Sequence, residues 1–303
     1  MLCLLATLAC RAVSQADETL TIQHMPPDTS FDQRDAYALA LLQLALDRNV
    51  DDHGLARLQQ APFRVSQARA ARLTRDGDYL DILWVMSSQQ RESVLRPVRI
   101  PLMRGLMGAR VLVVRRDRQG QMSGVDTLRD LQQHPLDQGH DWPDTAILRA
   151  NGRRVQTSSD FHSLFRMLAR ERVDAVPRSI TEIWAERSIY DRLELTIEPQ
   201  LLLLYRAPSY FFVSPDRPDL HQRISTGLER AIADGGFEEL FLNHAAIKPA
   251  LTRLAEKDLR VIKLGNPDLG RETPLEREEL WYQPLFGDPQ VGPSTKQNQG
   301  FPR

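Results

Sequence analysis

Cysteine is nearly absent from this chain of 303 residues. Its only two cysteines, Cys3 and Cys10, lie within the first ten residues. If that segment is removed during export, the mature chain has neither a disulfide nor a thiolate metal site. The seven histidines lie far apart and show none of the spacings typical of zinc ligands. We therefore expect no metal and no cofactor.

Long apolar runs and an excess of charge are also missing. After residue 16 no run of about eighteen apolar residues occurs, so no membrane-spanning helix is expected in the body of the chain. The net charge is -1, and the arginine-rich stretch 91–118 has no interleaved aromatic residues, so we expect no nucleic-acid partner. The signatures Gly-x-Ser-x-Gly, the Walker loop and His-Glu-x-x-His are missing too. The sequence therefore offers no signature of an α/β-hydrolase, a P-loop NTPase or a zinc metalloprotease.

The N-terminal segment is typical of an export signal. Residues 2–9 form a short apolar core, and Ser14 and Ala16 place small residues at positions -3 and -1 of a signal-peptidase site. A basic region before the core is missing, which allows a start codon further upstream. Cys10 offers a lipoprotein site as an alternative, although Thr7 stands where an aliphatic residue is preferred. We predict a periplasmic protein cleaved after Ala16, with lipid anchoring as the second choice.

Strand-like and helix-like patterns alternate along the rest of the chain, which indicates α/β lobes with largely parallel sheets. The apolar run 79–86 is typical of a strand buried on both faces. Phe161, Leu164, Phe165 and Leu168 recur at helical spacing. Further strands are predicted at 19–24, 110–115, 173–176 and 210–214. Further helices are predicted at about 33–47, 63–74 and 126–133. Three more helices are predicted to begin after Pro143, after the capping box Ser179–Glu182, and at about Pro218.

Several short motifs occur along the chain in a characteristic order and spacing. The strand and turn at 84–92, WVMSSQQRE, end in serines followed by an arginine. Then come Ile100-Pro101-Leu102 with the strand Val111–Arg115, the turn and helix Gly139–Leu148, the segment Met167–Ala175, and the strand and helix Tyr210–Gly236. In this order, over about residues 18–245, the chain resembles the type 2 periplasmic solute-binding proteins, closest to the branch that binds amino acids for ABC transporters.

The resemblance implies a two-lobed α/β fold with a doubly wound sheet in each lobe and two crossover strands between them. It also implies capture of a small-molecule ligand in the cleft, burial of that ligand by closure, and delivery to an inner-membrane ABC permease or to a sensor. A monomer is the default for such proteins. The implied organisation is a signal peptide at 1–16, lobe 1 at 17–116, lobe 2 at 117–206, the return to lobe 1 with a C-terminal extension at 207–285, and a disordered tail at 286–303.

The sequence departs from well-studied amino-acid receptors of this branch in three places. Pro177-Arg178 stands where an acidic residue would hold a ligand amino group. The stretch 91–110 is unusually dense in arginine, and the C-terminal extension 264–282 is typical of an uncharacterised subgroup. Ligand identity therefore does not carry over. Because guanidinium groups grip carboxylates, we expect a small polar, anionic ligand of amino-acid or carboxylate type.

Arg91 is the first candidate for a ligand contact. It follows the end of a buried strand, where open α/β sheets present their clefts. Its guanidinium can hold a carboxylate or phosphate through two parallel hydrogen bonds, or it can lie on the surface beside Glu92. Ser87 and Ser88 either donate to the same anion or cap the next helix.

The second lobe supplies four more candidates. Arg178 lies between a strand and a helix N-terminus, which attracts anions, or else it caps a neighbouring loop. Trp142 either stacks on a planar part of the ligand or packs near the hinge. Thr145 belongs to the same helix start and is a candidate contact for the same reason. Ser158 is a helix cap first and a contact second.

The helix predicted at 33–47 opens with Asp32-x-Arg34-x-x-Tyr37, again after a strand. These three side chains either project into the cleft, or Asp32 pairs with Arg34 on the surface while Tyr37 joins the core. The second interpretation is slightly favoured, so none of the three is a committed contact.

Two rival functions stay open at this point. An enzyme on the same fold, similar to a dehydratase, would use a cleft carboxylate such as Glu182, Asp141 or Asp144 as acid or base. Glu182 is more easily explained as the partner of a helix cap. A receptor that has become a protein-interaction module would have its cleft filled by side chains, and Trp281 and Tyr282 would suit such a surface. We prefer to read those two as part of a clamp on lobe 1.

Overall fold

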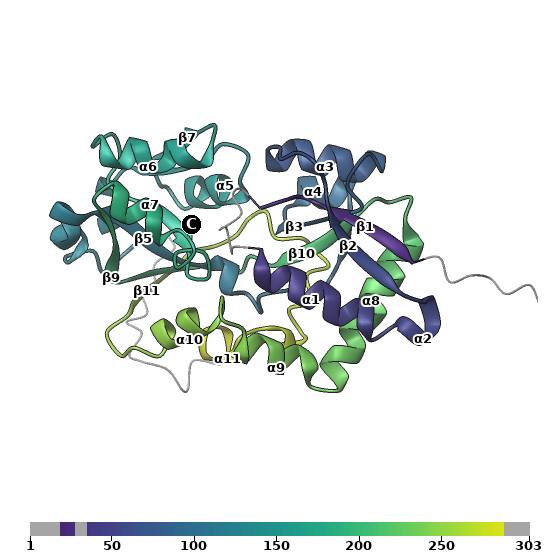
Figure 1. Ribbon diagram of the computed structural model, residues 1–303. Helices are drawn as coiled ribbons and strands as arrows, with labels where there is room; N and C mark the ends of the chain where they lie inside the picture. Colours follow the sequence, from purple (N-terminus) through teal and green to yellow (C-terminus); the bar gives the residue numbers. More distant parts are fainter. Residues whose placement is uncertain (1–18, 28–34, 288–303) are drawn as a thin grey trace, which may run out of the picture.

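The computed structural model describes residues 19–27 and 35–287. The predicted signal peptide, both cysteines, Asp32 and Arg34 therefore lie outside the described residues. Figure 1 shows two lobes side by side, with the C-terminal part of the chain in yellow along one side of both. In the described part of the chain, no helix has the length and apolar character needed to cross a membrane.

The first lobe contains a two-stranded sheet, β1-β2, and next to it a three-stranded sheet in the order β3-β10-β4. β1 lies beside β3, where the backbone N–H of Asp81 donates to the carbonyl of Gln23 (2.9 Å). The strands are β1 (Leu20–His24), β2 (Ala56–Gln60), β3 (Ile82–Met86), β4 (Arg96–Val98) and β10 (Ser209–Val213). The helices are α1 (Ala36–Asp47), α2 (Val50–His53), α3 (Gln67–Asp76), α4 (Gln89–Val94), α8 (Pro218–Ala233) and α9 (Gly236–Asn243).

The second lobe contains a sheet in the order β11-β9-β5-β8, continued by β6 and β7. The continuation is a parallel bridge between Leu136 and Ala175, the residue just before β8. The strands are β5 (Ala109–Arg115), β6 (Leu136–Gly139), β7 (Val155–Ser158), β8 (Val176–Ser179), β9 (Leu195–Leu204) and β11 (Arg260–Lys263). The helices are α5 (Pro143–Ala150), α6 (Phe161–Ala169) and α7 (Arg187–Arg192).

Each lobe combines parallel and antiparallel strand pairs, so the expectation of largely parallel sheets is wrong. β10 is antiparallel to β3 and β4, and β5 is antiparallel to β8 and β9. The registers give the reason. β5 and β10 begin at the connection between the lobes, whereas the strands paired with them end there. Each sheet thus receives one strand that enters from the other lobe and runs against its neighbours.

Most predicted elements are confirmed, including the strands near 19–24, 110–115 and 210–214 and the helix from Pro218, while the strand predicted at 79–86 begins at Ile82. Three predictions need correction. Of the short helix predicted at 126–133, only η3 (Asp130–Gln133) forms. The strand predicted at 173–176 begins only at Val176 and extends to Ser179. The helix expected to carry Trp184 does not form, because residues 180–186 are a series of turns and α7 begins at Arg187. Strands β2, β4, β6, β7, β9 and β11 were not predicted.

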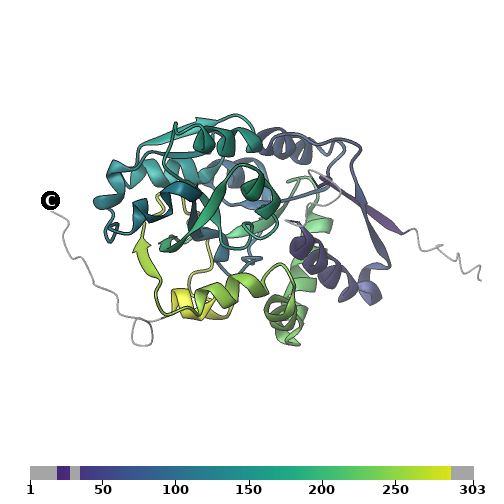
Figure 2. The same ribbon diagram turned by 60° about the vertical axis from the view of Figure 1, so that its left-hand side comes forward.

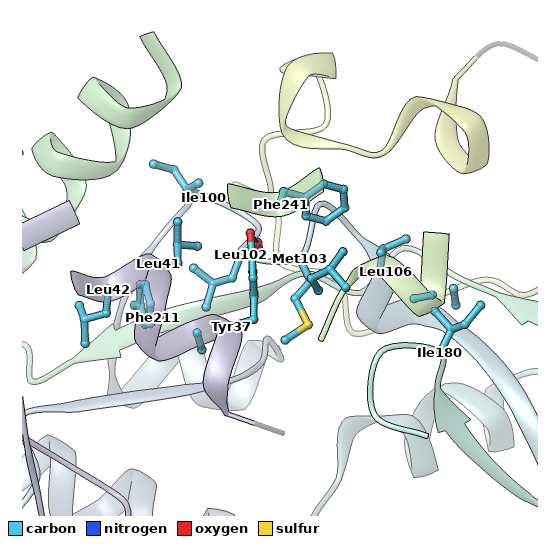
Figure 3. Close-up of a cluster of buried hydrophobic side chains, with 14 of the residues drawn as sticks. Tyr37, Leu41, Leu42, Ile100, Leu102, Met103, Leu106, Ile180, Phe211 and Phe241 are labelled. Carbon is cyan, nitrogen blue, oxygen red and sulfur yellow. Dashed lines mark hydrogen bonds between the residues drawn. The ribbon is translucent and has the colours of Figure 1, made fainter. Parts of the chain in front are cut away.

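One apolar core runs through the connection between the lobes. Figure 3 shows Met103 and Leu106, of the first crossing segment 103–108, between Tyr37 of lobe 1 and Ile180 of lobe 2, with Leu102 next to Tyr37. The hydroxyl of Tyr37 donates to the carbonyl of Leu102 (3.0 Å), so Tyr37 is a core residue, as the favoured interpretation held. η1 (Leu106–Gly108) completes this segment. The core therefore fixes one lobe against the other through buried apolar surface.

The C-terminal extension contacts both lobes and not lobe 1 alone. β11 pairs in parallel with β9, so both β11 and β5, which the sequence placed in lobe 1, belong to the sheet of lobe 2. In Figure 2, β11 is the yellow-green arrow beside the second lobe. Phe286, where the tail was predicted to start, still belongs to a helix, and residues 288–303 lie outside the described residues. The remaining elements are α10 (Lys248–Leu254), α11 (Gln283–Phe286), η2 (Arg116–Met122), η3 (Asp130–Gln133) and η4 (Glu278–Leu280).

Gly227 lets α8 pack closely on α1, and the Gly227→Ala variant tests this contact. A Cβ at Gly227 would lie 1.9 Å from the carbonyl oxygen of Ala45. Alanine forms helices better than glycine by about 1 kcal/mol. Only the steric overlap of the added Cβ with the carbonyl oxygen of Ala45 can therefore make the substitution destabilising. We expect a loss of about 2 kcal/mol in the free energy of unfolding, measured by urea denaturation. Gly124→Ala is the control, since no atom lies within 4 Å of its added Cβ; equal stability of the two variants would contradict the prediction.

Candidate functional site

A cavity of about 380 Å³ lies between the two lobes. Lobe 1 contributes Gln67 at the start of α3 and Trp84 of β3 to its wall. Lobe 2 contributes Trp142, just before α5, and Arg110 and Arg178 from β5 and β8. Pockets of this size hold small ligands in proteins. Because both lobes form the wall, a ligand held there would contact both at once.

Arg178 is a buried cation held between acids and aromatic rings. Its Nε and Nη2 donate to the two carboxylate oxygens of Glu186 (3.0 and 2.5 Å), and Nη2 lies 3.1 Å from Glu182. Its guanidinium lies over Trp142 and Phe161, 4.9 and 5.4 Å from the ring centroids. Burial alone would lower the pKa of Arg178, but the two glutamates outweigh burial and raise it. Arg178 is therefore always positively charged, and the glutamates and aromatic rings around it hold its guanidinium in place.

Arg110 makes a second buried network next to the first. Its Nη2 lies 2.7 Å from Asp144, and its Nε donates to the hydroxyl of Tyr205 (3.1 Å). That hydroxyl donates in turn to Asp144. Burial, opposed by the charge of Arg110, raises the pKa of Tyr205 well above its usual value, so the hydroxyl keeps its proton. Nη1 of Arg110 lies 3.4 Å from Glu182, which joins the two networks.

The wall of the cavity is acidic overall. Among the described residues it contains three arginines and five carboxylates, a formal charge of -2 with His162 neutral. The two buried arginines already have carboxylate partners. Of the arginine-rich stretch that suggested an anion, only Arg110 lines the cavity. The residues in the wall are Arg64, Arg110 and Arg178 with Asp35, Asp141, Asp144, Asp160 and Glu182.

Solved structures of similar architecture identify the fold. The chain matches a histidine kinase sensor domain described as similar to periplasmic binding proteins, with a TM-score of 0.50 and 18% identity over 74% of this chain and 94% of that one. It matches the VFT2 domain of BvgS from Bordetella pertussis with a TM-score of 0.54 and 19% identity over 74% and 91%. It matches an ancestral arginine-binding protein bound to glutamine with a TM-score of 0.52 and 15% identity over 75% and 98%. The chain has the type 2 periplasmic-binding-protein fold. No family model and no curated protein matches the sequence.

Two of the seven candidate residues, Arg178 and Trp142, line the cavity of this periplasmic-binding-protein fold. Thr145 is buried, and its hydroxyl donates to the carbonyl of Gly139 (2.8 Å). Ser158 is buried, and its hydroxyl donates to Asp137 (2.7 Å). These two hydroxyls thus have partners inside lobe 2, away from the cavity wall.

The first-lobe candidates lie beside the cavity and do not line it. The hydroxyl of Ser88 accepts from the backbone N–H of Arg91 (3.2 Å), so Ser88 caps α4, as one of its two interpretations held. The hydroxyl of Ser87 donates to Glu92. Both serines are at most 5% exposed. The hydrogen bonds of both serines therefore belong to the N-terminus of α4.

Arg91 connects the two lobes. Its Nη1 donates to the carbonyl of Met86 (2.7 Å), and its Nη2 donates to the side chain of Gln67 (2.7 Å) and to the carbonyl of Asp141 in lobe 2 (3.1 Å). Burial lowers the pKa of Arg91 to about 10, and nearby Asp141 partly offsets this, so it stays charged at neutral pH. Its guanidinium is thus occupied by protein acceptors.

A second contact lies beside the bond from Arg91. A carboxylate oxygen of Asp141 in lobe 2 accepts from the backbone N–H of Ala68 (3.2 Å), in the first turn of α3 in lobe 1. The N-terminus of a helix carries unpaired N–H groups and partial positive charge, which a carboxylate stabilises. The lobes therefore touch at the wall of the cavity through a polar contact.

Several residues of the wall were not predicted as contacts, although some left a signal in the sequence. Arg110 comes directly before the apolar run Val111–Val114, and a charge buried there requires a partner. Trp84 interrupts an apolar strand with a large side chain that can donate a hydrogen bond. Phe161 was assigned to the core side of its helix, and the structure shows it half-buried at the edge of the cavity.

Arg91→Ala tests the role of Arg91 between the lobes. The variant leaves the carbonyls of Met86 and Asp141 without their donor inside a buried region, so we expect a loss of about 2–3 kcal/mol in the free energy of unfolding. Chemical denaturation measures it. Arg96→Ala serves as the control, because Arg96 is an exposed arginine on the neighbouring β4 and surface changes cost at most about 0.5 kcal/mol. A loss no larger than that of the control would show that these hydrogen bonds contribute little.

Proposed function

We propose that this chain is an exported solute-binding protein that holds one small polar ligand in the cavity between its lobes. The observation that carries the proposal is a cavity of about 380 Å³ whose wall comes from both lobes. Such a ligand favours the arrangement in which both lobes contact it, so binding shifts the population toward closure. The bound form is then presented to a membrane permease or to a sensor.

The ligand that suits this wall carries a positively charged amino group. The formal charge of -2 favours a cation, and the buried arginines already hold carboxylates, so an added anion would have to displace a partner. Trp84 and Trp142 add aromatic surface, which attracts ammonium groups. An amino acid with a cationic side chain, or a small diamine, meets these conditions. Of the amino-acid and carboxylate ligands that the sequence suggested, a ligand that carries only carboxylates suits this wall less well.

Catalysis receives less support from the same geometry. Glu182 contacts Arg178 and Arg110, Asp144 contacts Arg110 and Tyr205, and the carboxylate of Asp141 accepts from a backbone N–H of lobe 1. A general acid or base has to exchange its proton with the substrate, whereas these three carboxylates are already engaged by groups of the protein. The alternative of a protein-interaction module required a cleft filled by side chains. A cavity of about 380 Å³ between the lobes does not agree with a filled cleft.

A thermal-shift comparison tests the ligand class. The probes are L-lysine, L-arginine and putrescine on one side, and succinate and inorganic phosphate on the other, all at millimolar concentration. A probe at about a hundred times its Kd stabilises the folded state by about 2.7 kcal/mol, a shift of several degrees in Tm. We expect that shift with at least one amine and with neither anion. A shift produced by the anions alone would overturn the proposed charge preference.

A pair of variants tests the place of binding. Trp142→Ala removes a ring from the cavity wall. It should weaken the apparent affinity for the amine at least tenfold, a change of about 1.4 kcal/mol in binding free energy, and the Tm shift should become smaller. Tyr79→Ala removes an exposed aromatic ring, 62% accessible, outside the cavity and should leave the shift unchanged. If both variants respond to the amine like the parent, the ligand binds elsewhere.

A further inference from the structure

The segment 264–287, called the strap below, leaves one lobe and reaches the other across the back of their connection. It begins after β11 in lobe 2, where the side chain of Asn266 donates to the carbonyl of Arg206 (2.8 Å). Asp268 then accepts from the backbone N–H of Gln89 (3.1 Å), at the start of α4 in lobe 1. The strap thus adds a covalent connection between the lobes beside the crossing segments 103–108 and 204–208 (Figure 1).

The strap holds the first crossing segment by its backbone. The N–H of Tyr282 donates to the carbonyl of Arg104 (2.8 Å), and the guanidinium of Arg104 donates to the carbonyl of Glu279 (3.0 Å). The rings of Trp281 and Phe286 cover Gly105 so closely that a Cβ there would lie 2.8 and 2.5 Å from them. The backbone of this segment is therefore in direct contact with two aromatic side chains of the strap.

The same two rings hold the second crossing segment. The guanidinium of Arg206 lies 5.0 Å from the ring centroid of Trp281 and 5.2 Å from that of Phe286. It also donates to the carbonyl of Phe286 (3.4 Å). Trp281 is 1% exposed, and its indole N–H donates to the carbonyl of Pro274 (2.9 Å), which fixes the ring inside the strap. One pair of rings therefore contacts both segments that join the lobes.

These contacts lie where a rotation of the lobes must take place. Hinge motion is absorbed by a few residues that change their backbone dihedral angles. Arg104 and Gly105 have φ angles of +47° and +86°, a left-handed pair within the first crossing. Only a local contact keeps a bulky residue such as Arg104 in that region, and the hydrogen bonds to Tyr282 and Glu279 provide it. A change in these dihedral angles would have to break the contacts of the strap.

We propose that the strap is a brace for the hinge, and that Trp281 sets the balance between closed and open arrangements of the lobes. The crossing segments alone would allow a wider range of interlobe distances. The proposal concerns the protein without any ligand, so it stands or falls independently of the ligand class proposed above.

Spin-label distance measurements on the full chain test the brace. Labels go on Arg72→Cys in α3 and Arg170→Cys after α6, both exposed and on opposite lobes, with Cys3 and Cys10 replaced by serine. The parent should give one narrow distance distribution. Trp281→Ala should add a population at longer distance and raise the ratio of open to closed molecules about tenfold. Leu275→Ala, an exposed change in the same strap, should match the parent.

Arg206→Gln is the second variant, because removal of a buried tryptophan can also unfold the chain. It takes the cation from between the two rings and leaves the core in place, so it should broaden the distribution less than Trp281→Ala does. In the double variant the two effects should not add, since both remove one shared contact. If Trp281→Ala folds, as circular dichroism shows, and keeps the parent distribution, the brace is refuted. If it does not fold, an unchanged distribution in Arg206→Gln refutes it.

Discussion

The arrangement of the second lobe depends on one carboxylate shared by two buried arginines. Glu182 lies 3.1 Å from Arg178 and 3.4 Å from Arg110, two guanidinium groups that are each 2% exposed. A buried charge without a partner costs several kcal/mol, so each of these cations needs an acid in a fixed place. Glu182 also accepts from the backbone N–H of Ser179 (3.1 Å), as the capping box predicts. The residues around it form turns that direct Glu182 and Glu186 toward Arg178, where a continuous helix was expected.

This network also explains why an arginine-rich sequence encloses an acidic cavity. Counting arginines along the chain suggests an anion site, because the sequence does not show where their partners lie. In the folded chain the cavity arginines Arg110 and Arg178 hold carboxylates, and Arg91 holds backbone carbonyls of both lobes. The guanidiniums therefore shape the cavity, while its excess charge comes from the acids around them.

The fold could be predicted from the sequence, whereas the residues of the site could be predicted only in part. Elements with strong local patterns, such as β3 and α8, follow from apolar periodicity and from capping residues. β2 and β11 could not be found in this way, since their short polar sequences become strands only by pairing with β1 and β9. Arg178 was found because it stands between a predicted strand and a helix N-terminus, and Trp142 because it opens a predicted helix. Arg91 follows a strand end, and only the packing of Asp141 and Gln67 shows that its donors are used within the protein.

The late position of β11 in the chain has a consequence for the order of folding. β9 contributes Leu201, Leu202, Leu203 and Leu204 to the sheet, all at most 5% exposed, and β11 pairs with these four residues. During synthesis the strand that covers this edge appears more than fifty residues after the rest of the lobe, on the far side of α8, α9 and α10. An apolar sheet edge without its neighbour can pair with other chains. The second lobe therefore cannot finish folding as an independent unit when its own stretch of chain is complete, and it has to be kept apart from other molecules until the first lobe has been completed.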